Sequence, residues 1–319
     1  MMQMKKISIL IPCYNEEGNV EKMYTAVTHE MQKLNQYTYD IFFIDNKSLD
    51  HTEDVLRSIA ERDKDHVRVI FNLRNFGPNQ SGAYGFFQTD GDASICLACD
   101  FQDPPELIPQ FIKKWENGAK VVWGQKVSSN ESRLMWHIRS LYYKIIKEFS
   151  SIKQYEQVTG FGLYDRQVVQ LMKKMGDPVP NFRNLVPEMG FDIEFIRYEQ
   201  PARKWGVSSY NLYRYIDAAL SSLVNTSRVP LRLAVIGGFL IGCLNFLIGF
   251  IYLILKLIFW DNFSMGLAPI LIGIFFLGGV ILSFIGLLGE YIGELLLRVT
   301  NRPLVIERER LNFNNEEKQ

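Results

Sequence analysis

The chain has 319 residues, and its 35 lysines and arginines balance its 35 aspartates and glutamates. This length allows one sizeable domain and a smaller part. The balanced charge argues against nucleic acid as a general partner, because such proteins carry a basic excess. The mean hydropathy of -0.04 averages two unlike regions, a charge-rich one up to residue 228 and an apolar one over residues 229–299. We expect the main domain boundary between them.

The N-terminal region shows no secretory signal. Its apolar run, residues 7–11, is too short for one and ends at Pro12, so the first domain is predicted to stay in the cytoplasm. The cysteines suggest no disulfide framework. Cys96 and Cys99 spell C-x-x-C inside a predicted strand, without a second pair to complete a zinc site, and we interpret them as core residues.

Five short apolar runs alternate with helical patterns in the first part of the chain. This order predicts an α/β domain with a parallel sheet covered by helices on both faces. The runs are apolar almost throughout, as strands buried on both faces should be. They are residues 7–11, 41–44, 67–71, 94–97 and 120–123.

Polar side chains follow each of these runs. Ligands of open α/β sheets bind beyond the carboxyl ends of the strands, so five such clusters describe one site. Neither a G-x-G-x-x-G nor a P-loop motif is present, and a nucleotide must therefore be held differently. Asp45 can accept hydrogen bonds from a base or ribose, and a metal near Asp100 can neutralise a pyrophosphate. The clusters are residues 14–17, 45–46, 72 with 74, 100–103 and 125–126.

Two later segments are long and apolar enough to span a membrane, about 233–258 and about 267–291. Arg228 precedes the first and Arg298 follows the second, which predicts a hairpin with both termini in the cytoplasm. Residues 210–230 mix apolar and charged side chains in a pattern typical of an amphipathic helix on the membrane surface. A plain soluble helix is the alternative for this segment.

Several motifs resemble those of a known family. Residues 9–17 (I-L-I-P-C-Y-N-E-E) resemble the opening strand and loop of inverting glycosyltransferases of the GT-A fold. Residues 100–106 (D-F-Q-D-P-P-E) resemble the D-L-Q-D-P-P-E run of the polyisoprenyl-phosphate branch, which includes dolichol-phosphate mannose synthase and bacterial lipid-phosphate glucosyltransferases. Residues 74–77, 160–166 and 203–208 and the two-helix tail follow in family order. The resemblance covers nearly the whole chain.

The resemblance implies roles for particular residues. Asp100 and Gln102 would hold Mg²⁺ or Mn²⁺, and Asp100 and Arg203 would act at the donor phosphates as the catalytic groups. The residues implied to contact the nucleotide are Pro12, Tyr14, Glu16, Asp45, Asn46, Ala98, Cys99 and Asp100.

The charge of the acceptor decides which side chains the enzyme needs to bind it. A sugar hydroxyl would need a general base, whereas a lipid phosphate is already anionic and needs cations to position it. Lys126, Arg133, Arg139 and Ser140 form a basic, hydroxyl-bearing stretch of this kind, and the resemblance places acceptor contacts at Lys126 and near Ser140. Arg133 or Arg139 would substitute for the arginine that the family leads us to expect at position 136. A solvated amphipathic helix is the alternative.

Three positions depart from the family pattern. Ala98 stands where the family often has the first aspartate of D-x-D, residues 45–48 read D-N-K-S in place of D-D-G-S, and Ser209 replaces a lysine. Losing one carboxylate should weaken metal binding, or leave more of the octahedral shell to the donor phosphates and water.

The predicted function is transfer of a sugar, with inversion, from a nucleotide donor to a polyisoprenyl phosphate such as undecaprenyl phosphate, for modification of cell-envelope glycans. UDP is the favoured nucleotide. The predicted organisation is a GT-A, Rossmann-like domain with a mostly parallel sheet (1–209), the surface helix (210–230), two transmembrane helices (231–299) and a cytoplasmic tail (300–319). We expect a multi-pass protein of the bacterial inner membrane, and a homo-oligomer is plausible.

Two other functions are weighed against this one. A processive polysaccharide synthase would carry Q-x-x-R-W, but residues 200–205 put the tryptophan one place late, and two helices are too few for a channel. A non-catalytic, membrane-bound nucleotide-sugar sensor is favoured by Ala98. Against it, Asp100, Gln102 and Arg203 occur together.

Overall fold

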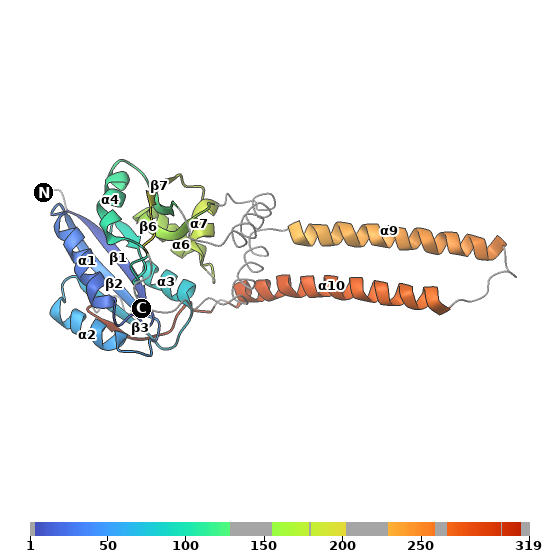
Figure 1. Ribbon diagram of the computed structural model, residues 1–319, viewed down its shortest axis with the longest axis horizontal. Coiled ribbons are helices and arrows are strands. Elements are labelled where there is room, and N and C mark those ends of the chain that lie inside the picture. The colour runs from blue at the N-terminus through green and yellow to red at the C-terminus, as the bar shows by residue number, and fades with distance from the viewer. Residues whose placement is uncertain are drawn as a thin grey trace. The chain divides into compact units, whose positions relative to one another are not determined.

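The computed structural model describes residues 4–127, 155–178, 180–201, 229–258, 267–300 and 302–313. The chain divides into two units, one with the N-terminal region and residues 301–319, the other with residues 211–300. The first unit contains an eight-stranded sheet (Figure 1). Its strands are β1 (Lys5–Cys13), β2 (Tyr37–Asp45), β3 (Val67–Asn72), β4 (Ala93–Cys96), β5 (Val121–Lys126), β6 (Val158–Asp165), β7 (Ile193–Tyr198) and β8 (Glu307–Leu311).

The strands lie in the order β7-β5-β6-β4-β1-β2-β3-β8. β6 is antiparallel to both β4 and β5, and β8 is antiparallel to β3, whereas the other neighbouring pairs are parallel. The five strands predicted from apolar runs are confirmed as β1 to β5, and the α/β, mostly parallel sheet is confirmed with them. The carboxyl ends of β1, β2, β3, β4, β5 and β7 therefore meet at one edge of the sheet.

Helices cover both faces of this sheet, as predicted. Successive strand residues point to opposite faces, so Ile9 packs on one side and Leu10 on the other. The first side is covered by α1 (Val20–Gln32), α2 (Thr52–Arg62) and α4 (Ile108–Glu116), and the second by α3 (Pro78–Phe87), α6 (Arg166–Met175) and α7 (Phe182–Glu188). A short 3-10 helix, η1 (Pro105–Leu107), precedes α4.

The reversed strand β6 depends on a glycine. A Cβ at Gly162 would lie 2.1 Å from the carbonyl oxygen of Val122, so a side chain there would force β5 and β6 apart. The run V-T-G-F-G-L-Y-D was recognised in the sequence as a motif but not as a strand, because its glycines interrupt the apolar pattern.

The segment predicted as a cytoplasmic tail contributes the edge strand β8. Arg308 forms an ion pair with Glu53 of α2 at 2.6 Å, and Glu309 forms one with Arg57. The side-chain amide of Asn312 donates to the carbonyl oxygens of Ala60 (2.8 Å) and Val67 (2.9 Å). β8 reads E-R-E-R-L and was not predicted, because a charged edge strand carries no apolar run.

The second unit contains two long helices, α9 (Val229–Ile258) and α10 (Leu267–Val299). They contact one another near Gly238, where a Cβ would lie 3.5 Å from the ring of Phe284. Among the described residues one helix, α10, is long and apolar enough to cross a membrane, over Phe276–Gly293, and on α9 the stretch Val235–Leu244 is apolar but shorter. The two helices lie where they were predicted, and a second span stays a prediction. The predicted surface helix falls largely outside the described residues.

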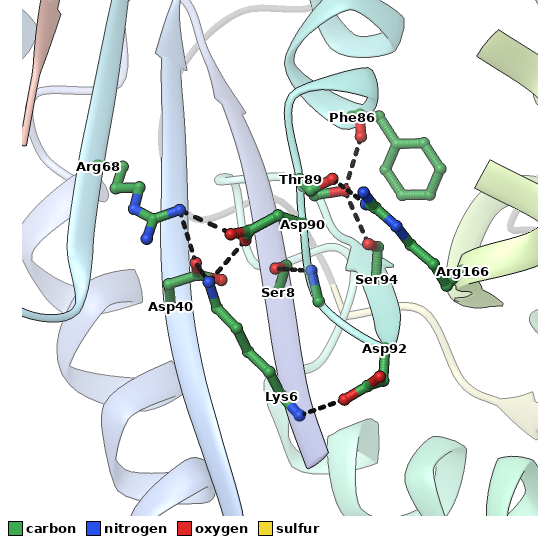
Figure 2. A network of polar contacts seen from close by, with 11 residues as sticks. Lys6, Ser8, Asp40, Arg68, Phe86, Thr89, Asp90, Asp92, Ser94 and Arg166 are labelled. Carbon is green, nitrogen blue, oxygen red and sulfur yellow. Dashed lines mark hydrogen bonds and ion pairs between the residues drawn. The ribbon is translucent and has the colours of Figure 1, made fainter. Parts of the chain in front are cut away.

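A charged cluster joins the strands near the edge opposite the carboxyl ends. Lys6 forms ion pairs with Asp40 and Asp90, both at 2.6 Å, and Arg68 approaches the same two carboxylates at 3.1 and 3.3 Å. Figure 2 shows these four side chains converging from β1, β2, β3 and the loop before β4. The Asp40 side chain is 2% exposed, and burial raises its pKa although Lys6 opposes this. The two cations therefore stabilise a carboxylate that the fold has removed from water.

Replacing Asp40 tests the cluster. Asp40→Ala leaves Lys6 and Arg68 partly buried without this counter-charge, and should lower the free energy of unfolding by about 2 kcal/mol. Thermal denaturation in detergent measures the loss. Asp54→Ala is the control, because its ion pair with His51 is solvent-exposed, and its midpoint should match that of the unchanged protein. Equal midpoints for both variants would show that the Asp40 cluster contributes nothing.

The β8 anchor predicts a pH dependence. The hydrogen bonds from Arg308 and Arg57 hold the pKa of Glu53 below its ordinary value, although burial opposes them. A lowered folded-state pKa stabilises the fold above the unfolded-state value of about 4.3, and this stabilisation is lost as the pH falls. The unfolding free energy of the unchanged protein should therefore exceed that of Glu53→Gln at pH 7, with the difference shrinking toward pH 3. A difference that is constant with pH would contradict this account.

Candidate active site

The candidate site lies where the parallel strands end. The loop after β1 rests on the loop after β2: the Asn15 backbone N–H donates to Ser48 Oγ (2.9 Å), and Asn15 Oδ1 accepts from the Leu49 N–H (2.8 Å). Asn15 adopts a left-handed conformation with φ of 57°, which asparagine tolerates better than most residues. The two loops thus form one surface beyond the strands.

Asp45 closes the turn of the second loop. Its Oδ1 accepts hydrogen bonds from the Ser48 hydroxyl (2.5 Å) and backbone N–H (3.2 Å). The residue is 1% exposed, and burial raises the pKa of its carboxyl group. Asp45 is the last residue of β2, at the carboxyl edge of the sheet, and its nucleotide contact stays a prediction. Within the protein, its carboxylate holds the turn that carries Ser48.

Asn46 links the ends of three strands through its side chain and its backbone N–H. Its Oδ1 accepts from Asn72 Nδ2 (3.1 Å) and from the Phe76 N–H (2.9 Å), and its Nδ2 donates to Asn75 Oδ1 (3.0 Å). Its backbone N–H donates to the carbonyl oxygen of Cys13 (3.0 Å). Asn46 is 5% exposed, so the predicted nucleotide-binding residue also connects the ends of β1, β2 and β3.

The first loop offers one exposed aromatic ring. Tyr14 is 36% exposed, whereas Glu16 is 9% exposed and accepts a hydrogen bond from Asn19 Nδ2 (2.6 Å). The carbonyl oxygen of Glu16 accepts from the Val20 N–H (3.0 Å) at the start of α1. Pro12 is half-buried against α3. In this loop Tyr14 is therefore the side chain best placed for a ligand, and Glu16 contributes to the helix start.

The loop after β4 is tightly folded. Asp100 Oδ1 accepts from the Gln102 N–H (3.1 Å), and Phe101 adopts a left-handed conformation with φ of 61°. A bulky residue rarely has positive φ, and such strain clusters at functional sites. Asp103 Oδ2 accepts from the Ala98 N–H (3.0 Å), which closes the loop.

The two cysteines near this loop are core residues, as predicted. Cys99 is 2% exposed and packs in the core, and its nucleotide contact stays a prediction. Burial and a hydrogen bond with Cys99 raise the pKa of Cys13. Burial also raises the pKa of Cys96, to about 12. The thiols of Cys13 and Cys96 are therefore held in the neutral form.

The donor set fits a hard divalent cation that is shared with a ligand. Asp100 offers a carboxylate that is 8% exposed, and Gln102 an amide oxygen, the ligand types that Mg²⁺ and Mn²⁺ prefer. Among the described residues, no three His, Cys, Asp or Glu side chains converge on one point. The residues present therefore suit a metal completed by donor phosphates and water rather than one enclosed by protein ligands.

Lys126 is the one predicted acceptor-phosphate residue that the structure describes. It ends β5, beside Tyr198 at the end of the parallel strand β7. Burial raises the pKa of Asp103 to about 6, and the nearby Lys126 ammonium opposes this rise. Lys126 thus lies close to the Asp100–Asp103 loop. The predicted site residues Arg133, Arg139, Ser140 and Arg203 lie outside the described residues.

The sequence pattern did not single out two residues that lie at this edge. Tyr198 donates a hydrogen bond to Asp103 Oδ1 (3.2 Å), but neither residue was given a role. The alternating run I-E-F-I-R-Y of β7 could have located Tyr198 at a strand end. Between β6 and β7, helix α7 begins at an Asn181 cap and buries Leu185 and Val186.

Comparison with known proteins places the chain in a family. The model for glycosyl transferase family 2 matches residues 8–171. The bactoprenol glucosyl transferase of Shigella phage SfII is 33% identical over 302 residues, which cover 94% of this chain and 97% of that protein. The chain belongs to glycosyl transferase family 2.

One more sequence relative and one solved structure can be compared with this family 2 glycosyltransferase. The prophage bactoprenol glucosyl transferase homolog of Escherichia coli K12 is 32% identical and covers 94% of this chain and 98% of its own. The solved mannosyl-3-phosphoglycerate synthase from Rubrobacter xylanophilus is 14% identical, with a TM-score of 0.47 over 73% of this chain and 75% of that one. The predicted family and enzyme class are confirmed by the sequence relatives.

Two substitutions distinguish a residue that stabilises the loops from a residue that contacts the ligand directly. Asn46→Ala leaves buried partners unsatisfied, and should lower both the unfolding free energy, by about 2 kcal/mol, and the affinity for UDP. Tyr14→Ala should weaken UDP binding about tenfold through loss of an aromatic contact, without lowering the thermal midpoint. Calorimetric titration and thermal denaturation measure the two effects. If Asn46→Ala weakened UDP binding at an unchanged midpoint, Asn46 would act as a direct ligand and not through the loops.

Proposed function

We propose that this glycosyltransferase transfers a sugar from a nucleotide, with UDP favoured, to the phosphate of a polyprenyl lipid, with inversion at the sugar. One observation carries the proposal. Tyr14, Asp100 and Lys126 lie at the same edge of the sheet at which the antiparallel strand β8 begins, and β8 follows the apolar helix α10 after a short connection. After the apolar helix α10, the chain therefore enters the sheet at the edge that holds the candidate site. The relatives named as bactoprenol glucosyl transferases support a lipid-linked acceptor.

The donor side follows from the loops after β1 and β4. Tyr14 offers its exposed ring to the nucleotide, and Asp100 with Gln102 would hold Mg²⁺ or Mn²⁺ against the diphosphate. The metal supplies Lewis-acid stabilisation of the negative charge that develops on the leaving diphosphate. Arg203 adds a permanently charged partner in this proposal.

The acceptor side needs positioning more than proton removal. A lipid phosphate is anionic at neutral pH, so its oxygen can attack the anomeric carbon without a general base. Lys126 holds that phosphate, and Arg133, Arg139 and Ser140 extend the same role in the proposal. The phosphate oxygen forms a bond to the anomeric carbon as the bond to the nucleoside diphosphate breaks. Direct in-line attack inverts the anomeric centre.

The membrane arrangement belongs to the same proposal. α9 and α10 form a two-helix transmembrane hairpin, with the catalytic domain and both termini in the cytoplasm of a bacterium. The amphipathic pattern of residues 210–230 would hold the domain at the lipid surface. A polyprenyl tail stays in the bilayer, so an anchored enzyme searches for its acceptor in two dimensions. Packing through the hairpins would make a homo-oligomer.

A transfer assay tests the function. Purified protein with undecaprenyl phosphate, Mn²⁺ and a panel of labelled nucleotide sugars should move label from one donor into the lipid phase. Asp100→Asn should lower the rate at least about 100-fold, because it removes a charged group from the leaving-group side. The control is Asp192→Asn, an exposed carboxylate just before β7 at the opposite edge of the sheet, which should retain activity. Nucleotide binding without transfer from any donor would contradict the proposal and favour a sensor.

A further inference from the structure

A buried carboxylate outside the predicted site connects its two sides. Asp103 is 7% exposed, and each of its oxygens accepts a hydrogen bond from a different element. Oδ2 accepts from the Ala98 N–H of the loop after β4 (3.0 Å), and Oδ1 accepts from the Tyr198 hydroxyl at the end of β7 (3.2 Å). Asp103 therefore joins the loop that carries Asp100 to the part of the sheet that carries Lys126.

Lys126 lies next to this pair. It is in register with Tyr198 on the neighbouring parallel strand, and the Val127 N–H donates to the Tyr198 carbonyl oxygen (2.9 Å). The Lys126 charge also acts on Asp103, where it opposes the effect of burial on the pKa of that carboxyl group. The Asp103 carboxylate thus accepts a hydrogen bond from Tyr198 and interacts electrostatically with Lys126.

The ring of Tyr198 is held in place by its surroundings. It packs edge-to-face on Phe161 with ring centroids 5.6 Å apart. Gly124 makes room for both rings, since a Cβ there would lie 2.6 Å from the Phe161 ring and 3.0 Å from the Tyr198 ring. The hydroxyl of Tyr198 is therefore directed at Asp103 by packing and not only by its hydrogen bond.

A buried carboxylate is an expensive way to stabilise a fold. Replacement of buried charged groups by well-packed apolar residues is often neutral or stabilising, so a role in stability alone does not explain Asp103. Asp103 shares a loop with the metal-side residue Asp100, and it bonds Tyr198, the register partner of the acceptor-side residue Lys126. A group in this place fixes the distance between the donor-side and acceptor-side residues. Small changes in that distance lower the rate of transfer.

We infer that Tyr198 is a positioning residue of the transfer reaction, which orients the Asp103 carboxylate and through it the ammonium of Lys126 toward the acceptor phosphate. The inference rests on the proposed function. With the hydroxyl removed, Asp103 Oδ1 loses a donor, and Lys126 turns to that oxygen in place of the acceptor. The bond from the Ala98 N–H to Oδ2 remains, so the donor-side loop keeps its shape.

The test compares two tyrosines that make the same kind of bond. Tyr198→Phe removes the hydroxyl bond to Asp103, and Tyr24→Phe removes the bond from Tyr24 to Asp63 Oδ2 (2.9 Å) between α1 and the end of α2, outside the site. Tyr198→Phe should lower kcat about tenfold and raise the KM for undecaprenyl phosphate, with the Kd for UDP changed less than about twofold. Tyr24→Phe should leave all three unchanged. Parallel losses of stability, UDP affinity and activity in Tyr198→Phe would mean a merely structural role and overturn the inference.

A double-substitution cycle identifies the route of the effect. If Tyr198 acts through Lys126, adding Tyr198→Phe to Lys126→Ala should cost no further activity, whereas fully additive losses would overturn the inference. Binding of farnesyl phosphate by calorimetry gives a readout that needs no turnover, and both single variants should weaken it. Weakened binding without any sugar transfer by the unchanged protein would contradict the proposed function while leaving Tyr198 as a positioning residue. Transfer that Tyr198→Phe leaves unaltered would contradict only the inference.

Discussion

The site depends on how the chain satisfies its polar groups where parallel strands end. A strand that stops beside a parallel neighbour leaves backbone groups that must find partners before the loop can turn. In this protein side chains of the adjacent loop supply them. Ser48 bridges Asp45 to Asn15, and Asn46 accepts or donates four hydrogen bonds that reach the ends of β1 and β3. Residues that look like ligand contacts in the sequence are therefore also the framework on which exposed residues such as Tyr14 stand.

The reversed strand β6 has a second consequence for this edge. It separates β4 from β5, so the predicted donor-side loop and the predicted acceptor-side strand are not neighbours in the sheet. The Asp100–Asp103 loop bridges the gap by reaching Tyr198, two strands beyond β6. The close approach at Gly162 and the space at Gly124 allow this arrangement. Glycines that interrupt the apolar pattern of the sequence thus allow the Asp100–Asp103 loop to contact β7.

The direction of β8 connects the sheet to the apolar part of the chain. Because β8 is antiparallel to β3, its first residue pairs with Asn72, at the edge that holds the site. Ion pairs of Arg308 with Glu53 and of Glu309 with Arg57 hold the strand on α2. A parallel strand in the same place would have connected α10 to the opposite edge. β8 also covers β3, and its charged residues disfavour pairing of this sheet edge with another chain.

The sequence by itself determined the family, the five apolar strands, the sites of the two long helices and the edge at which Asp100 and Lys126 meet, because local patterns and strand-end motifs carry that information. Only the tertiary structure decided the hydrogen bond between Asp103 and Tyr198, which lie 95 positions apart in the chain and are brought together by the strand order. It also decided that residues 307–311 complete the sheet, because a polar edge strand is recognisable only once its neighbour is in place. Long-range contacts between polar residues leave no periodic pattern in the sequence. For this reason only the folded structure shows them.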